Sequence, residues 1–94
     1  MIEIKIREKE IQMRGHACCK KNGQDIVCAA ISAMTCNLIN SLRNLANEEI
    51  CTEVASGFMI IAWQKLSDRG KLLIDSWFLG LSDINREYNC IRFI

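Results

Sequence analysis

The sequence contains a single histidine, His16, and a cysteine, Cys28, follows it twelve residues later. A thiol that lies beside an imidazole is an effective nucleophile, because the imidazole accepts the thiol proton and later returns a proton to the leaving group. Such a pair can hydrolyse a peptide bond without a metal ion or an organic cofactor. The first question is therefore whether the predicted elements can bring His16 and Cys28 together.

A helix is predicted to position Cys28. It extends from Asp25 to about Ala46, where apolar residues recur every three or four positions and form one stripe: Val27, Ile31, Met34, Leu38, Leu42 and Leu45. If Asp25 is the N-cap, Cys28 is the third residue of the first turn, where the positive end of the helix dipole favours a thiolate. Ser32 follows one turn later on the same side, beside the apolar stripe.

Two supporting positions have more than one interpretation. Asp25 can cap the helix, or it can orient the imidazole of His16 and leave the first-turn N–H groups free to bind an oxyanion. We favour the cap. Ser32 can support the site beside Cys28, although a serine inside a helix more commonly donates a hydrogen bond back to the preceding turn.

The residues between His16 and the helix are predicted to form a loop. Residues 17–24 show no hydrophobic periodicity, and Asn22-Gly23 is a strong turn signal. A loop of this length can return the chain from a strand end to a helix start at one edge of a sheet. Zinc ligation is a minor alternative, because the spacing of His16, Cys18, Cys19 and Cys28 matches no usual zinc pattern.

The rest of the sequence predicts strands around one further helix. Alternating side chains indicate strands over residues 1–8, 11–14 and 49–55, and the apolar, β-rich residues 58–65 indicate a strand inside the sheet. Residues 89–94 are predicted to form a final short strand, and a helix capped by Ser67 covers Asp68 to about Glu87. Its inner stripe is Leu73, Trp77, Leu81, Ile84 and Tyr88. The order is ββαββαβ, which predicts an α+β fold with a mixed sheet and two packed helices in one domain, residues 1–94.

Composition limits the partners and the compartment. Twelve basic and eleven acidic residues give a formal net charge of +1, which argues against nucleic acid or an anionic membrane as the main partner. We expect no membrane span and no signal peptide, since no apolar run reaches the required length. Without a secretion signal, the six cysteines indicate reduced thiols in the cytoplasm.

The residues around the predicted site resemble the signature of a known family. Gly15-His16-Ala17, Gly23 and the stretch from Asp25 to Ser32 are similar to the signature of the ribosomal-processing cysteine protease (Prp) family, including the interval from histidine to cysteine. The resemblance extends more weakly along nearly the whole chain. It departs at Cys18-Cys19, where the family has a small or flexible residue followed by an aromatic one.

This resemblance implies roles for individual residues. Cys28 would be the nucleophile and His16 its partner, with Asp25 and Ser32 as supporting positions, while Gly15 would let the backbone pass close to the site. A mobile loop that orders when the peptide binds would include Ala17, Cys18, Cys19 and Gly23. No metal or cofactor is implied.

The resemblance also implies an activity and partners. Members of the family are homodimeric endopeptidases that remove an N-terminal extension from a large-subunit ribosomal protein, member twenty-seven of its set, during ribosome assembly. Two alternatives remain open at this point. One is a ribosome-associated binding protein with an unreactive Cys28, and the other is a redox-responsive or zinc-holding protein that depends on Cys18 and Cys19.

Overall fold

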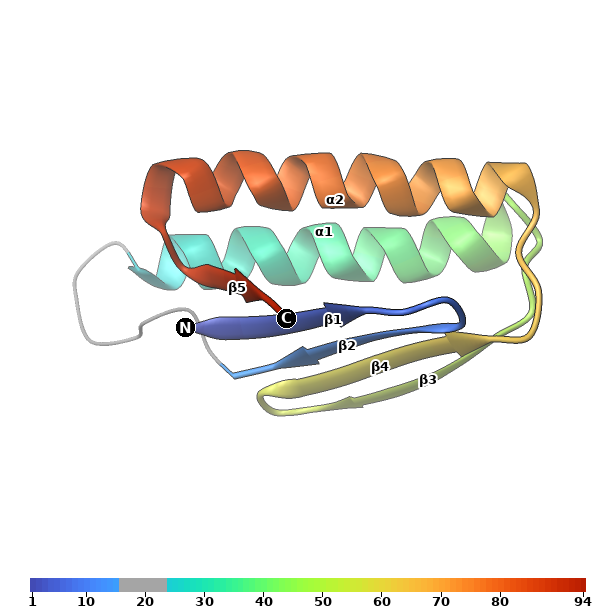
Figure 1. Ribbon diagram of the computed structural model, residues 1–94, viewed down its shortest axis with the longest axis horizontal. Helices are drawn as coiled ribbons and strands as arrows, with labels where there is room; N and C mark the ends of the chain where they lie inside the picture. The colour runs from blue at the N-terminus through green and yellow to red at the C-terminus, as the bar shows by residue number, and fades with distance from the viewer. Residues whose placement is uncertain (16–23) are drawn as a thin grey trace.

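The computed structural model describes residues 1–15 and 24–94, and for residues 24 and 25 it describes the backbone alone. Five strands and two helices follow one another in the predicted order ββαββαβ (Figure 1). Their bounds are β1 Ile2–Ile6, β2 Glu10–Arg14, α1 Gln24–Asn44, β3 Ile50–Ala55, β4 Phe58–Trp63, α2 Asp68–Tyr88 and β5 Ile91–Phe93.

The strands form one mixed sheet, and both helices pack on the same face of it (Figure 1). The strand order is β3-β4-β2-β1-β5; β1 and β5 are parallel, and the other neighbours are antiparallel. The short β5 therefore returns the chain beside its own beginning, where Ile2 pairs with Ile91. The predicted α+β fold is confirmed.

The core lies between the sheet and the helix layer. The alternating strand residues Ile2, Ile4, Ile11, Met59 and Ile61 pack there against Val27, Ile31, Leu38, Leu42, Ile74, Trp77 and Leu81 of the two helices. Charged side chains of β1 and β2 occupy the opposite face of the sheet, as the strand alternation requires. The stripe predicted for the first helix thus packs on the sheet along most of its length.

Two positions of the predicted apolar stripes are exposed instead. Leu45 is 69% exposed because α1 ends at Asn44, and the chain buries Ala46 as it turns toward β3. Tyr88 is 52% exposed because it is the last residue of α2. Both stripes were extended one residue too far, past the region where the helices and the sheet overlap.

The apolar character of α1 also corrects the expectation that no segment is long enough to span a membrane. Among the described residues, Ile26–Asn44 meets the length and hydropathy of a membrane helix, with a mean hydropathy of 1.3. In this fold, however, the most apolar side of the helix packs on the sheet, and Val27, Ile31, Leu38 and Leu42 are buried in the core. The segment is one of the two helices that pack on the sheet.

A buried hydrogen bond joins the two helices. The indole Nε1 of Trp77, on α2, donates to the Thr35 hydroxyl on α1 at 3.1 Å, and that hydroxyl donates to the Ile31 carbonyl at 2.8 Å. Trp77 is 3% exposed and Thr35 is 5% exposed, so water cannot readily replace either group as a hydrogen-bond partner. Ser67 caps α2 as predicted, because its hydroxyl accepts from the Gly70 N–H.

We predict that Thr35→Val lowers the free energy of unfolding by about 1–3 kcal/mol, because it leaves the buried Trp77 N–H without an acceptor. The same substitution in a Trp77→Phe background should cost markedly less, since no donor remains there. Urea unfolding of the four proteins measures both costs. If Thr35→Val lowers the free energy of unfolding equally with Trp77 and with Trp77→Phe, the hydrogen bond between the helices does not contribute to stability.

Candidate active site

Cys28 lies in a cleft between α1 and the β3–β4 hairpin, with a volume of about 360 Å³. The cleft is at the end of the molecule where α1 begins and where β2 ends (Figure 1). The residues at the floor of the cleft are Ile2, Met13, Ile31, Thr35 and Met59. One wall belongs to α1 and consists of Cys28, Ser32, Cys36 and Ile39. The other wall belongs to the hairpin and consists of Val54, Ala55, Ser56, Gly57 and Phe58, and Gly15 lies at one end. Among the described residues, the lining contains no charged side chain.

The first residue of α1 lies two positions before the one that an Asp25 cap would give. The helix begins at Gln24, so Asp25 is its second residue and not the N-cap, and Cys28 is its fifth residue and not its third. A helical side chain leans toward the N-terminus, so the Cys28 thiol is directed toward the first turn. The backbone N–H groups of that turn have no partner within the helix and can bind a developing negative charge.

Cys28 and Ser32 line the same wall of the cleft, one helical turn apart. Cys28 is half-buried and packs partly against the core, whereas Ser32 is exposed. Within the described part of the chain, the Ser32 hydroxyl makes no hydrogen bond, and it is the Thr35 hydroxyl that donates back into the helix. The Ser32 hydroxyl is therefore available to a group that enters the cleft.

Gly15 adopts a backbone conformation that favours glycine. Its φ is +101°, and an added Cβ would lie 2.6 Å from the carbonyl oxygen of Met1. Its N–H donates to the Gly57 carbonyl at 2.8 Å, which ties the end of β2 to the β3–β4 turn. Gly15 thus holds the chain against the cleft immediately before His16.

Several predicted site residues lie outside the described residues: His16, Ala17, Cys18, Cys19 and Gly23. The structure brings together Gly15, Cys28 and Ser32 at one cleft, and Gly15 is the residue that precedes His16 in the sequence. In residues 1–15 and 24–94, no group of three or more histidine, cysteine or acidic side chains is arranged to hold a metal ion.

Sequence analysis did not predict the second wall of the cleft. The β3–β4 hairpin reaches Cys28 through sheet pairing between segments far apart in the chain, and this placement leaves no local pattern. The signals that were present are Gly57, which forms the turn with a φ of +72°, and Cys36, which follows Cys28 two turns later on α1. Neither signal by itself indicates a cleft.

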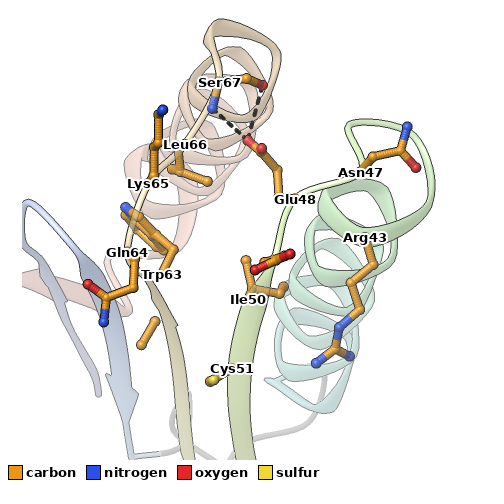
Figure 2. A pocket seen from close by; sticks show the side chains of 12 residues that line it. Arg43, Asn47, Glu48, Ile50, Cys51, Trp63, Gln64, Lys65, Leu66 and Ser67 are labelled. Carbon is orange, nitrogen blue, oxygen red and sulfur yellow. Dashed lines mark hydrogen bonds between the residues drawn. The ribbon is translucent and has the colours of Figure 1, made fainter.

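A larger cleft of about 700 Å³ (Figure 2) is lined by residues at the end of α1 and just before α2, at the opposite end of the molecule (Figure 1). Glu48 crosses its mouth and accepts hydrogen bonds from the Ser67 N–H at 2.9 Å and the Ser67 hydroxyl at 3.1 Å. Cys51 lines this cleft, but His16 is bonded to Gly15 at the other end of the sheet. The Glu48 contacts connect the start of β3 to the start of α2, which is a structural role.

Comparison with known proteins gives consistent matches. The family model described as "Cysteine protease Prp" matches residues 1–91. The chain is 28% identical to the ribosomal processing cysteine protease Prp of Bacillus subtilis (strain 168) over 101 aligned residues, which cover 94% of this chain and 90% of that protein.

Solved structures with the same fold include the essential ribosomal processing protease Prp of S. aureus. Its complex with a covalently linked product peptide superimposes with a TM-score of 0.83 and 27% identity, covering 98% of this chain and 94% of that one. Its complex with a substrate peptide gives a TM-score of 0.78 and 25% identity, covering 99% and 95%.

The conformation of Gly15 yields a test. We predict that Gly15→Ala lowers the free energy of unfolding by about 1–3 kcal/mol, because the added methyl group forces a strained conformation against Met1. Gly80→Ala is the control: Gly80 is inside α2, and its added methyl group meets the flexible end of Met34, which can move. If urea unfolding shows equal losses for the two variants, the strain assigned to Gly15 is wrong.

Proposed function

The chain belongs to the Prp family of cysteine proteases, and on that premise we propose that it removes the N-terminal extension of a large-subunit ribosomal protein, member twenty-seven of its set. One observation carries the proposal: Cys28 lies in an open cleft whose end is formed by Gly15, the residue bonded to the single histidine. The names of the relatives support a ribosomal protein as the substrate.

In the proposed reaction, His16 accepts the Cys28 proton and the thiolate attacks the carbonyl carbon of the scissile peptide bond. First-turn N–H groups of α1 bind the oxyanion of the tetrahedral intermediate. His16 then donates its proton to the leaving amine, and a thioester to Cys28 remains. Water, activated by His16, hydrolyses that thioester and restores the thiol, so the cycle requires neither metal nor cofactor.

We further propose that the enzyme acts in the cytoplasm as a homodimer, with the precursor protein as its partner. Exposed free thiols at Cys36 and Cys51 are compatible with a reducing compartment. The formal net charge of +1 supports recognition of the peptide extension rather than direct binding to nucleic acid. Neither the compartment nor the second copy enters the chemical steps above.

The decisive experiment is to incubate the protein with a peptide that spans the extended N-terminus and to weigh the products by mass spectrometry. We predict one discrete cut by the wild type, no detectable cut by Cys28→Ala, and a rate at least about 100-fold lower for His16→Ala. Cys51→Ala is the matched control, since it removes an exposed thiol at the far end of the sheet and should leave the rate unchanged.

An intact peptide that binds wild type and Cys28→Ala equally would refute proteolysis and support a peptide-binding protein with the same fold. Cleavage that persists in Cys28→Ala would place the nucleophile elsewhere.

A further inference from the structure

The edge strand β3 has backbone groups available for another strand. It is the first strand in the sheet order and pairs with β4 alone. The pair Ala55–Phe58 flanks a two-residue turn, and hydrogen-bonded and non-hydrogen-bonded pairs alternate from there along an antiparallel ladder. By this alternation, the N–H and C=O groups of Thr52 and Val54 point away from β4, toward the open edge.

Val54 presents an uncovered apolar side chain at this edge. It shares a face of β3 with Thr52, whose hydroxyl accepts a hydrogen bond from Arg43 of α1 at 3.0 Å, so Val54 is also on the helix side of the sheet. Even so, Val54 is 69% exposed. With Cys36 and Ile39 of α1 it lines the cleft, which leaves an apolar concavity between the helix and the edge strand.

This concavity is continuous with the site of Cys28. From Cys28 to Ile39 the helix rises about 16 Å, enough to accompany about five residues of an extended peptide. The hydrogen bond between Arg43 and Thr52 connects α1 to β3 just beyond that point. The cleft thus has the length and the open edge that an extended segment needs on one side of the scissile bond.

We propose that β3 is the docking edge for the substrate: an extended, uncharged segment of the peptide adds to the sheet beside Thr52 and Val54 and inserts an aliphatic or aromatic side chain between Val54, Cys36 and Ile39. Main-chain pairing gives affinity that is independent of sequence, and the concavity selects the side chain. The absence of charge from the described lining supports an apolar occupant. This inference rests on the proposed protease function and assigns specificity within it.

The test separates binding from chemistry by using Cys28→Ala, which retains the cleft and does not cleave. In that background, fluorescence anisotropy with the labelled extension peptide should show Val54→Asp weakening binding roughly tenfold or more, because the carboxylate is placed where an apolar group docks. In the active enzyme, Val54→Asp should raise KM by a similar factor with kcat within about twofold. Leu72→Asp is the matched control, since Leu72 is also 69% exposed but lies on α2.

Two further probes address the pocket and the backbone. Cys36→Phe fills the concavity and should weaken binding as Val54→Asp does, while both variants retain the wild-type urea midpoint. A series of peptides, each methylated at one backbone nitrogen, should show losses at alternate positions only, because every second N–H of an added strand faces β3.

Each outcome decides the proposal. If Val54→Asp and Leu72→Asp bind the peptide equally while the wild type still cleaves it, docking at β3 is overturned and the protease function stands. If the wild type cleaves nothing but Val54→Asp still weakens binding, docking is supported and proteolysis fails. If Val54→Asp instead converts a dimer to a monomer in sedimentation and leaves peptide affinity unchanged, the edge is a contact between copies and the proposal is wrong.

Discussion

The apolar side of α1 packs on the sheet through Val27, Ile31, Leu38 and Leu42, and this contact fixes the rotation of the helix about its axis. Because successive helical residues are about 100° apart, burying that side directs Cys28 and Ser32 to its border, where they face the cleft. Turning the thiol away would expose part of the core. The position of the proposed nucleophile therefore depends on the energy of core packing, and the first turn needs no special conformation.

The cleft forms where several chain segments end together. The end of β2, the turn between β3 and β4 and the start of α1 meet at one end of the sheet (Figure 1). Gly15 allows two of these segments to approach closely, since its N–H binds the Gly57 carbonyl and its missing side chain leaves room for Met1. The Trp77–Thr35 hydrogen bond secures α1 from the other side. Rigid elements thus surround a site that opens at a sheet edge.

Much of this architecture could be predicted from the sequence because its signals are local. The alternation of Ile2, Ile4 and Ile6 identifies β1, the period of the α1 stripe identifies the helix, and Ser67 has the side chain that an N-cap requires. The placement of Cys28 beside Ser32 follows from the same helical period. These features depend on neighbours a few residues apart, and their physical causes are visible in the printed sequence.

The remaining features depend on contacts between distant segments or on the ends of elements. Nothing near residue 54 indicates that Val54 faces Cys36 across a cleft, since the two residues meet only when β3 takes the edge of the sheet. The start of α1 was misplaced because capping residues such as Asp25 are also common within a first turn, so the position of a cap is uncertain by a residue or two. His16 was inferred as the partner of Cys28 from residue type and spacing, and it lies outside the described residues.

The central claim is that Cys28 is the reactive nucleophile and depends on His16. The most direct test is to treat the protein with a chloromethyl ketone of the extension peptide and to map the modified cysteine by mass spectrometry of tryptic fragments. Exposure alone favours Cys36 and Cys51, which are more accessible than the half-buried Cys28. We predict that Cys28 is modified first and that the extension peptide without the chloromethyl ketone protects Cys28 from modification. In His16→Ala, Cys28 should no longer be modified before the other cysteines. Equal modification of Cys36 and Cys51, unchanged in His16→Ala, would contradict this account.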